Sequence, residues 1–383
     1  MDFDIIWVLL GLPIAFALGW AASRMDLRQL KIENRDNPKA YFRGLNFLLN
    51  EQQDQAIDAF IEAVQNDPDT SELHFALGNL FRRRGEYERA VRVHEHLLSR
   101  GDLSKADLHR AQHALALDFL KAGLLDRAEA GLLKLEGTAF EQEARLALLA
   151  NYERSRDWAQ AAVVAAKLEQ AAPGSFSTRL AHYLCEEAHA QAANPAQARA
   201  LLEQAIAQAP GAPRARLALA QMLQNQEQHA QALDILHQAM QACPAATPLI
   251  APMLAASALA CGQTDIAIKE LQAAYAHAPC LDVLEATVGL LQAQGVAPQQ
   301  ARQAYVQHLE KEPSLVAASH WLAGEQLEHE QFHPLIQRAL DQAVKPLRRY
   351  RCAACGFEAQ HHFWHCPGCQ AWDSYPARRV EEL

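Results

Sequence analysis

The chain has 383 residues, of which 50% are hydrophobic and only 7% aromatic, and its formal net charge at pH 7 is −10. Residues 1–36 contribute −1 and residues 345–383 contribute +2, so residues 37–344 carry −11. Such an acidic body disfavours nucleic-acid binding, which depends on Lys and Arg side chains that neutralise phosphates. The length allows two or three ordinary domains or one long array of repeats.

A transmembrane helix is predicted at residues 1–22. The stretch 5–22 contains no charged residue, and its eighteen residues would span about 27 Å as a helix, enough to cross the hydrocarbon layer. A cleaved signal peptide is the alternative interpretation, but signal peptides begin with positive residues. Here Asp2 and Asp4 precede the apolar stretch, so an uncleaved anchor is favoured.

The bases beside this helix predict its orientation. Arg24, Arg28, Lys31 and Arg35 follow the apolar stretch, and no base precedes it. Cytoplasmic flanks carry the excess of Lys and Arg, so we expect residues 23–383 to lie in the cytoplasm. Residues 23–36 form a polar juxtamembrane connector in this interpretation.

Residues 37–344 show a repeated pattern. Gly44, Phe47 and Ala56 recur 34 residues later, as Gly78, Phe81 and Ala90. A period of 34 with small residues at unit positions 8 and 20 is typical of tetratricopeptide repeats, in which each unit is a pair of antiparallel helices. Small residues at these positions let the two helices approach, and a larger residue at position 24, such as Phe60 or His94, fills the space beside them.

The alanine of position 20 marks eight successive units. It occurs at Ala56, Ala90, Ala128, Ala161, Ala198, Ala232, Ala267 and Ala301. Residues 315–344 are predicted to form a ninth, atypical helix pair that caps the stack. The predicted fold is therefore an all-α superhelical solenoid, since single units cannot bury their apolar faces alone.

The inner face of the first two units is the predicted partner-binding surface. Side chains that point away from the partner helix of each unit include Tyr41, Leu45, Phe75 and Arg82. Residues 329–333 match the H-E-x-x-H motif of zinc peptidases. Pro334 disfavours helical geometry at His333, so we interpret this match as a loop between helices, and the chain offers no other catalytic motif.

Eight cysteines fall into two groups. Cys185, Cys243, Cys261 and Cys280 are scattered through the repeats and are interpreted as small core residues of a protein in a reducing compartment. Cys352, Cys355, Cys366 and Cys369 form two C-x-x-C turns separated by ten residues, a strong signature of four thiolates around one metal ion.

Residues 345–383 are accordingly predicted to form a small rubredoxin-like metal-binding domain that depends on its ion to fold. Four thiolates leave no open coordination position, which indicates a structural site, and both zinc and iron accept this geometry. We expect one iron or zinc ion per chain. The aromatic residues of the module are expected to supply most of its core: Phe357, Phe363, Trp364, Trp372 and Tyr375.

The order of these parts resembles the lipopolysaccharide assembly protein B family of Gram-negative bacteria. The resemblance rests on residues 44–49 and 77–82 of the repeats and on Tyr350 to Phe357 and Trp364 to Trp372 around the cysteines. It implies an inner-membrane adaptor with a periplasmic N-terminus and no catalysis of its own. In this family the adaptor promotes proteolysis of the lipid A pathway deacetylase by a membrane-bound AAA+ metalloprotease.

Two other functions remain open from the residues alone. A redox-active iron tetrathiolate protein would use the same four cysteines to carry electrons. A general assembly scaffold would use the same repeats without any role in lipopolysaccharide synthesis. The oligomeric state, monomer or homo-oligomer, is also left open.

Overall fold

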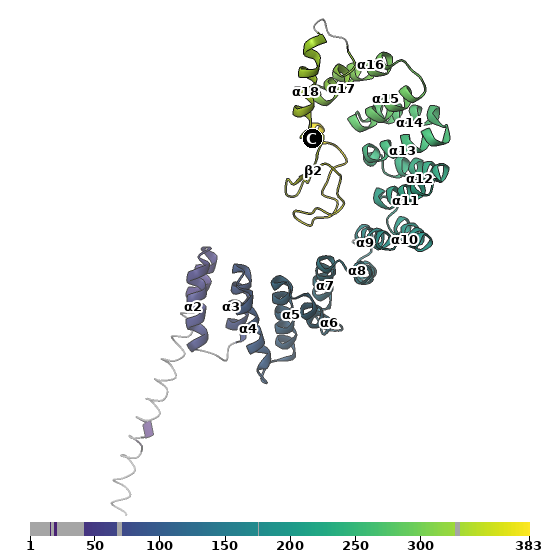
Figure 1. Cartoon of the computed structure of the whole chain (residues 1–383). Helices are drawn as coiled ribbons and strands as arrows, with labels where there is room; N and C mark the ends of the chain where they lie inside the picture. The colour runs from purple at the N-terminus through teal and green to yellow at the C-terminus, as the bar shows by residue number, and fades with distance from the viewer. Residues whose placement is uncertain (1–15, 17–18, 21–41, 67–70, 175, 326–329) are drawn as a thin grey trace, which may run out of the picture. The chain divides into compact units, whose positions relative to one another are not determined.

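The computed structural model of the protein describes residues 16, 19–20, 42–66, 71–174, 176–325 and 330–383. The expected transmembrane helix and the connector at 23–36 therefore lie outside the described residues, apart from Phe16, Gly19 and Trp20. Tyr41 lies outside them as well. The remainder is a succession of helices, followed by the small cysteine-containing module (Figure 1).

The chain divides into two compact units, Met1–Asp157 and Trp158–Leu383. The boundary falls inside the fourth predicted repeat. The first unit contains a helix at residues 42–49, then α2 (Gln53–Asn66), α3 (Ser71–Arg84), α4 (Tyr87–Ser99), α5 (Lys105–Ala122), α6 (Leu125–Leu133) and α7 (Glu141–Ser155).

The second unit continues the repeats and ends in the metal-binding module. Its helices are α8 (Trp158–Ala171), α9 (Ser177–Ala190), α10 (Pro195–Gln208), α11 (Pro213–Asn225), α12 (His229–Ala242), α13 (Thr247–Cys261), α14 (Thr264–His277), α15 (Leu281–Ala293), α16 (Pro298–Leu309), α17 (Leu315–Leu322) and α18 (His333–Val344). Helices α17 and α18 pack on each other, as predicted for the ninth pair.

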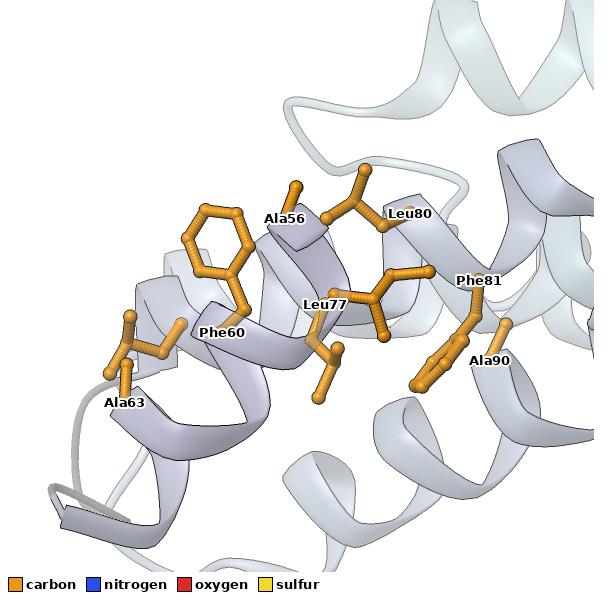
Figure 2. Packing of buried hydrophobic residues seen from close by; sticks show 9 residues of the cluster. Ala56, Phe60, Ala63, Leu77, Leu80, Phe81 and Ala90 are labelled. Atoms are coloured by element: carbon orange, nitrogen blue, oxygen red, sulfur yellow. The ribbon is translucent and has the colours of Figure 1, made fainter. Parts of the chain in front are cut away.

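The predicted packing rule of the repeats is confirmed. All eight position-20 alanines are at most 4% exposed. A Cβ atom on Gly44 would lie 3.0 Å from the Phe60 ring, and one on Gly78 would lie 2.5 Å from the His94 ring. Figure 2 shows the resulting core of the first unit, in which Phe60 and Leu77 pack beside Ala56. The small residues are therefore required by the close approach of paired helices.

Helix ends follow local sequence signals. The Ser104 hydroxyl accepts a hydrogen bond from the Asp107 amide at the start of α5, and the Asn194 side chain does the same for Gln197 in α10. Helix α5 ends at Gly123 in the left-handed conformation (φ 80°). These residues satisfy backbone groups that a helix leaves unpaired at its ends.

Among the described residues, one helical stretch, Pro244–Cys261, is long and apolar enough to cross a membrane. It comprises the short 3₁₀ helix η1 (Pro244–Ala246) and α13. Ile250 and Leu254 on this stretch are fully buried, and α13 packs against α12 and α15. The apolar composition of α13 is accounted for by its place inside the repeat array.

The scattered cysteines mostly lie in the core, as predicted. Cys185, Cys243 and Cys280 are buried, whereas Cys261 is only half-buried. Burial raises the pKa of Cys185 to about 11. Burial also raises the pKa of Cys243 and Cys280, so these three buried thiols stay protonated and unreactive near neutral pH.

Candidate metal centre

The two cysteine turns fold into the same local structure. In the first, the Cys352 amide donates to the Phe357 carbonyl (2.9 Å), and the Gly356 amide donates to the Cys352 carbonyl (2.9 Å). A short antiparallel pair, β1 (Tyr350–Arg351) and β2 (Glu358–Ala359), closes this turn.

The second turn repeats those hydrogen bonds. The Cys366 amide donates to the Ala371 carbonyl (2.9 Å), and the Gln370 amide donates to the Cys366 carbonyl (2.8 Å). The residue after the second cysteine is left-handed in both turns, Gly356 with φ 77° and Gln370 with φ 61°. Each turn thereby aims both of its thiols to one side.

The four sulfurs meet in one cluster. The Sγ atoms of Cys352 and Cys369 are 3.8 Å apart, those of Cys355 and Cys366 are 3.7 Å apart, and all four lie within 4.8 Å of one another. A metal–sulfur bond of about 2.3 Å implies about 3.8 Å between the corners of a tetrahedron. The donor set and its spacing therefore fit one tetrahedral zinc or iron ion.

The ligands differ in exposure and in hydrogen bonding. Cys352 and Cys366 are buried, whereas Cys355 and Cys369 are exposed. Burial tends to raise the pKa of Cys352, but a side-chain hydrogen bond with Ser374 and hydrogen bonds from backbone amides outweigh it and lower the pKa to about 6. In contrast, a backbone hydrogen bond from Phe357 tends to lower the pKa of Cys355, but burial and hydrogen bonds to the other three thiols outweigh it and raise the pKa. Metal binding requires all four as thiolates, so the ion must displace the proton from Cys355.

The core of the module differs from the expected aromatic core. Phe357 is 44% exposed and Phe363 is 36% exposed, so that expectation is wrong for these two rings. The buried cluster consists of Tyr350, Cys352, Cys366 and Tyr375, and Leu249 of α13 packs against it. The module is too small to enclose its own apolar core, so it completes the core with a side chain from the repeats.

Trp372 packs against the repeat helices. Its ring stacks on His182 of α9 at 4.9 Å and meets Tyr183 and Trp158 edge to face at 5.7 and 6.2 Å between centroids. The next residue, Asp373, places Oδ2 2.8 Å from His182 Nε2. Arg214 of α11 lies 5.6 Å from the Trp372 ring. The second turn of the metal site is thereby attached directly to α8, α9 and α11.

The predicted partner-binding residues differ in how far they are exposed to solvent. Leu45 is half-buried against the first core cluster. Phe75 is only 1% exposed and packs with Leu97 and Ala111, so its ring is not available to a partner on this surface. Phe75 is buried because α3 packs against the next repeat. The position of a residue within its own repeat does not predict contacts with the next repeat.

Arg82 belongs to a buried network that sequence reasoning missed. Its Nη1 atom donates to Asp118 Oδ1 at 2.8 Å, and His94 Nδ1 lies 2.5 Å from Asp118 Oδ2. His94 and Asp118 are fully buried, and the Arg82 side chain is 18% exposed. The sequence did contain one signal of this network: Asp118 is an acidic residue within an otherwise apolar helix pattern, which indicates a buried ion pair.

The H-E-x-x-H match does not form one helical face in the described residues. His329 lies outside them, residues 330–332 form the short 3₁₀ helix η2 (Glu330–Phe332), and α18 begins only at His333. His333 Nε2 lies 2.9 Å from the Leu322 carbonyl oxygen. Its position beside α17 is that of a structural residue at a helix start.

Comparison with known protein families identifies both kinds of domain. Residues 350–375 match the rubredoxin metal binding domain, and residues 73–108 match the tetratricopeptide repeat. Comparison with solved structures finds similarity to Naa15/Naa10 bound to HypK-THB, with 15% identity, a TM-score of 0.46 and coverage of 81% of this chain and 47% of that one. A tetratricopeptide repeat protein from Parabacteroides merdae has 13% identity and a TM-score of 0.34, covering 75% and 98%.

Curated relatives match along nearly the whole chain. Lipopolysaccharide assembly protein B of Escherichia coli (strain K12) is 29% identical over 390 residues, which cover 97% of this chain and 98% of the relative. The protein of the same name from Haemophilus influenzae is 29% identical over 385 residues, covering 95% and 96%. The chain is therefore similar over nearly its whole length to lipopolysaccharide assembly protein B, and it combines tetratricopeptide repeats with a rubredoxin-type metal-binding domain.

Proposed function

We propose that this chain is a non-catalytic inner-membrane adaptor that regulates lipopolysaccharide synthesis. The name shared by its full-length relatives supports a role in lipopolysaccharide assembly. The proposal that the chain is not an enzyme rests on the metal centre, in which four sulfurs lie within 4.8 Å of one another. Four thiolate ligands fill a tetrahedral shell, so no position is left for a substrate or a reactive water.

The proposed mechanism is to raise the local concentration of a client protein. The client is the deacetylase of the lipid A pathway, and the destination is a membrane-bound AAA+ protease. An adaptor that binds both partners converts their encounter into a step within one complex, which speeds proteolysis without new chemistry. The helix expected at residues 1–22 would hold the adaptor in the inner membrane, with its N-terminus in the periplasm and the repeats in the cytoplasm.

The first two repeats are the proposed contact surface. Tyr41, Leu45 and Arg82 remain candidates there, whereas the buried Phe75 would act only by supporting the surface. Arg82 is held by Asp118 and reaches the Ala114 carbonyl (3.0 Å). A fixed guanidinium loses little freedom on binding a partner, which favours its use in recognition.

Turnover of the lipid A deacetylase in living cells tests this function. Three chains would be expressed at native abundance in cells that lack the protein: the full chain, a chain without residues 1–22, and a chain with all four clustered cysteines replaced by Ser. We expect normal turnover only with the full chain. Normal turnover with the anchorless chain would exclude membrane tethering as the mechanism, and unchanged turnover without any chain would exclude the function itself.

A redox role is the second candidate, because Cys355 and Cys369 are exposed ligands. An iron tetrathiolate with exposed sulfurs can exchange electrons with a partner at the surface. Protein loaded with zinc cannot do so. Full activity of the zinc-loaded chain would therefore exclude the redox role, whereas activity that requires iron would support it.

A further inference from the structure

Residues 379–382, Arg-Val-Glu-Glu, lie across the starts of two repeat helices. Glu382 Oε1 accepts a hydrogen bond from the Leu281 amide at the start of α15 (2.7 Å). Glu381 Oε1 accepts one from the Leu315 amide at the start of α17 (2.6 Å). We call this four-residue stretch the clasp segment. Two adjacent carboxylates thus occupy the N-termini of two different helices.

The two helix starts are equivalent positions of consecutive repeats, since Leu281 and Leu315 are 34 residues apart. The first amides of a helix lack partners within the helix and carry partial positive charge, which favours a carboxylate. The residue before α15 is Cys280, which provides no side-chain cap for this helix. Before α17, the Ser314 hydroxyl donates to Glu381 Oε2 at 2.8 Å.

The clasp segment makes a third contact through the positively charged side chain of Arg379. The Arg379 guanidinium forms three hydrogen bonds of 2.8, 3.0 and 3.2 Å to the carboxylate of Asp282, which is only 6% exposed. The same guanidinium lies 4.1 Å from the centroid of the Tyr350 ring. This surface therefore presents one acceptor for an arginine and two donors for carboxylates.

These groups would lose their partners if the clasp segment left. Asp282 would be a carboxylate without its arginine, and the Leu281 and Leu315 amides would lack their acceptors. Leaving the buried Leu281 amide and the buried Asp282 carboxylate unpaired is costly, because each would lack both water and a hydrogen-bond partner. Leu315 is 51% exposed, so its amide would exchange the Glu381 carboxylate for water. The surface is thus complementary to a peptide, and the clasp segment is a peptide that occupies it within the same chain.

We propose that the starts of α15 and α17, together with Asp282, form a docking site for protein segments with the pattern Arg-x-acid-acid. The clasp segment occupies this site in the conformation described. A partner protein with the same pattern binds after displacing it. The site is separate from the metal ligands and from the surface proposed for the first two repeats, so its failure would leave the proposed adaptor function intact.

Binding of a labelled peptide to full-length chains tests this site. The probe is a fluorescent peptide of residues 377–383, and binding is measured by fluorescence anisotropy. The E381Q/E382Q chain, whose own clasp segment is weakened, should bind the probe at least tenfold more tightly than the unmodified chain does. An E358Q chain is the matched control, because Glu358 pairs with Arg351 outside the site, and it should behave like the unmodified chain.

The chemistry of the probe gives the second comparison. A peptide with Gln at both Glu positions, or with the same residues in scrambled order, should bind the E381Q/E382Q chain at least tenfold more weakly than the original probe. Equal binding of the original and scrambled peptides would overturn the proposal, as would equal binding by the unmodified and E381Q/E382Q chains. Helicity and metal content would be checked on every chain.

A variant on the repeat side keeps the test valid if the E381Q/E382Q chain does not fold. The Asp282→Asn chain loses the arginine acceptor but retains both helix starts. It should bind the original probe and an Arg379→Ala probe with equal affinity. A preference of the Asp282→Asn chain for the arginine-containing probe would contradict the assignment of Asp282 as its acceptor.

Discussion

The indole of Trp372 lies flat against the imidazole of His182, with ring centroids 4.9 Å apart and 20° between the planes. Trp372 follows the last cysteine of the metal site, whereas His182 is a buried residue of α9. Stacked aromatic pairs contribute beyond the area that they bury. This pair therefore connects the metal site to the repeats.

Replacement of Trp372 by Ala should detach the module from α8 and α9. We expect a loss of about 3 kcal/mol in the free energy of unfolding, with faster hydrogen exchange in residues 350–375. Phe363→Ala is a suitable control, because Phe363 belongs to the same module but is 36% exposed. Equal effects of the two substitutions would show that Trp372 stabilises the module only internally.

Replacement of any clustered cysteine by Ser should weaken metal binding by on the order of tenfold or more, since even changes behind the ligands have effects of that size. Residues 350–375 should lose protection from exchange together with the metal, because binding and folding are coupled. Chelator titration with elemental analysis measures this. Cys261→Ser, a half-buried cysteine of α13, should leave metal content unchanged. Retention of one ion by a chain without all four clustered cysteines would place the site elsewhere.

Replacement of Asp118 by Ala should destabilise the first unit by about 3 kcal/mol, because it leaves Arg82 and His94 without their buried partner. Urea unfolding followed by circular dichroism measures the change. Glu62→Ala removes the exposed pair with Arg43, whose side chains are 53% and 50% exposed. That control should cost less than about 1 kcal/mol. Similar losses for both variants would mean that the Asp118 network contributes no more than a surface pair.

Replacement of Gly78 by Ala should destabilise the second repeat by about 1–3 kcal/mol, because the added methyl group meets the His94 ring. Thermal unfolding measures the effect. Gly101→Ala is the control, since a Cβ atom there meets no atom within 4 Å. A Gly78→Ala chain as stable as the Gly101→Ala chain would show that the paired helices can separate without cost.

Stability should fall below pH 6.5 through His308. Burial lowers the pKa of this residue below its usual 6.5, and the Tyr275 hydroxyl lies 2.6 Å from its Nδ1 atom. The folded state therefore binds fewer protons than the unfolded state, so the contribution is present above pH 6.5 and is lost as pH falls through the lowered pKa. Urea unfolding at pH 7.5 and 5.5 should show a smaller pH dependence for His308→Gln. A pKa above 6.5 for His308 by nuclear magnetic resonance would contradict this prediction.

The parts that could be predicted from sequence depend on local repetition. The position-20 alanines recur in every repeat because each repeat solves the same packing problem, and the two cysteine turns are defined by their spacing. Contacts between distant segments were not predictable in this way. Asp118 pairs with side chains of the preceding repeat, and Trp372, expected in the core of the module, packs on α9. Neither the repeat pattern nor the cysteine spacing requires a particular residue at position 118 or 372. Their contacts could therefore be identified only in the folded chain.

When the ion is removed, the second cysteine turn should open before the first. Gly356 adopts φ 77° in the first turn, where glycine has no steric penalty, but Gln370 and Asp373 adopt φ 61° and 50° in the second. A left-handed residue with a side chain costs about 1 kcal/mol or more, and the first turn, with Gly356 at this position, does not bear that cost. Slow removal of the ion should therefore release Cys366 and Cys369 before Cys352 and Cys355, and the fluorescence of Trp372 would report the first stage of the loss.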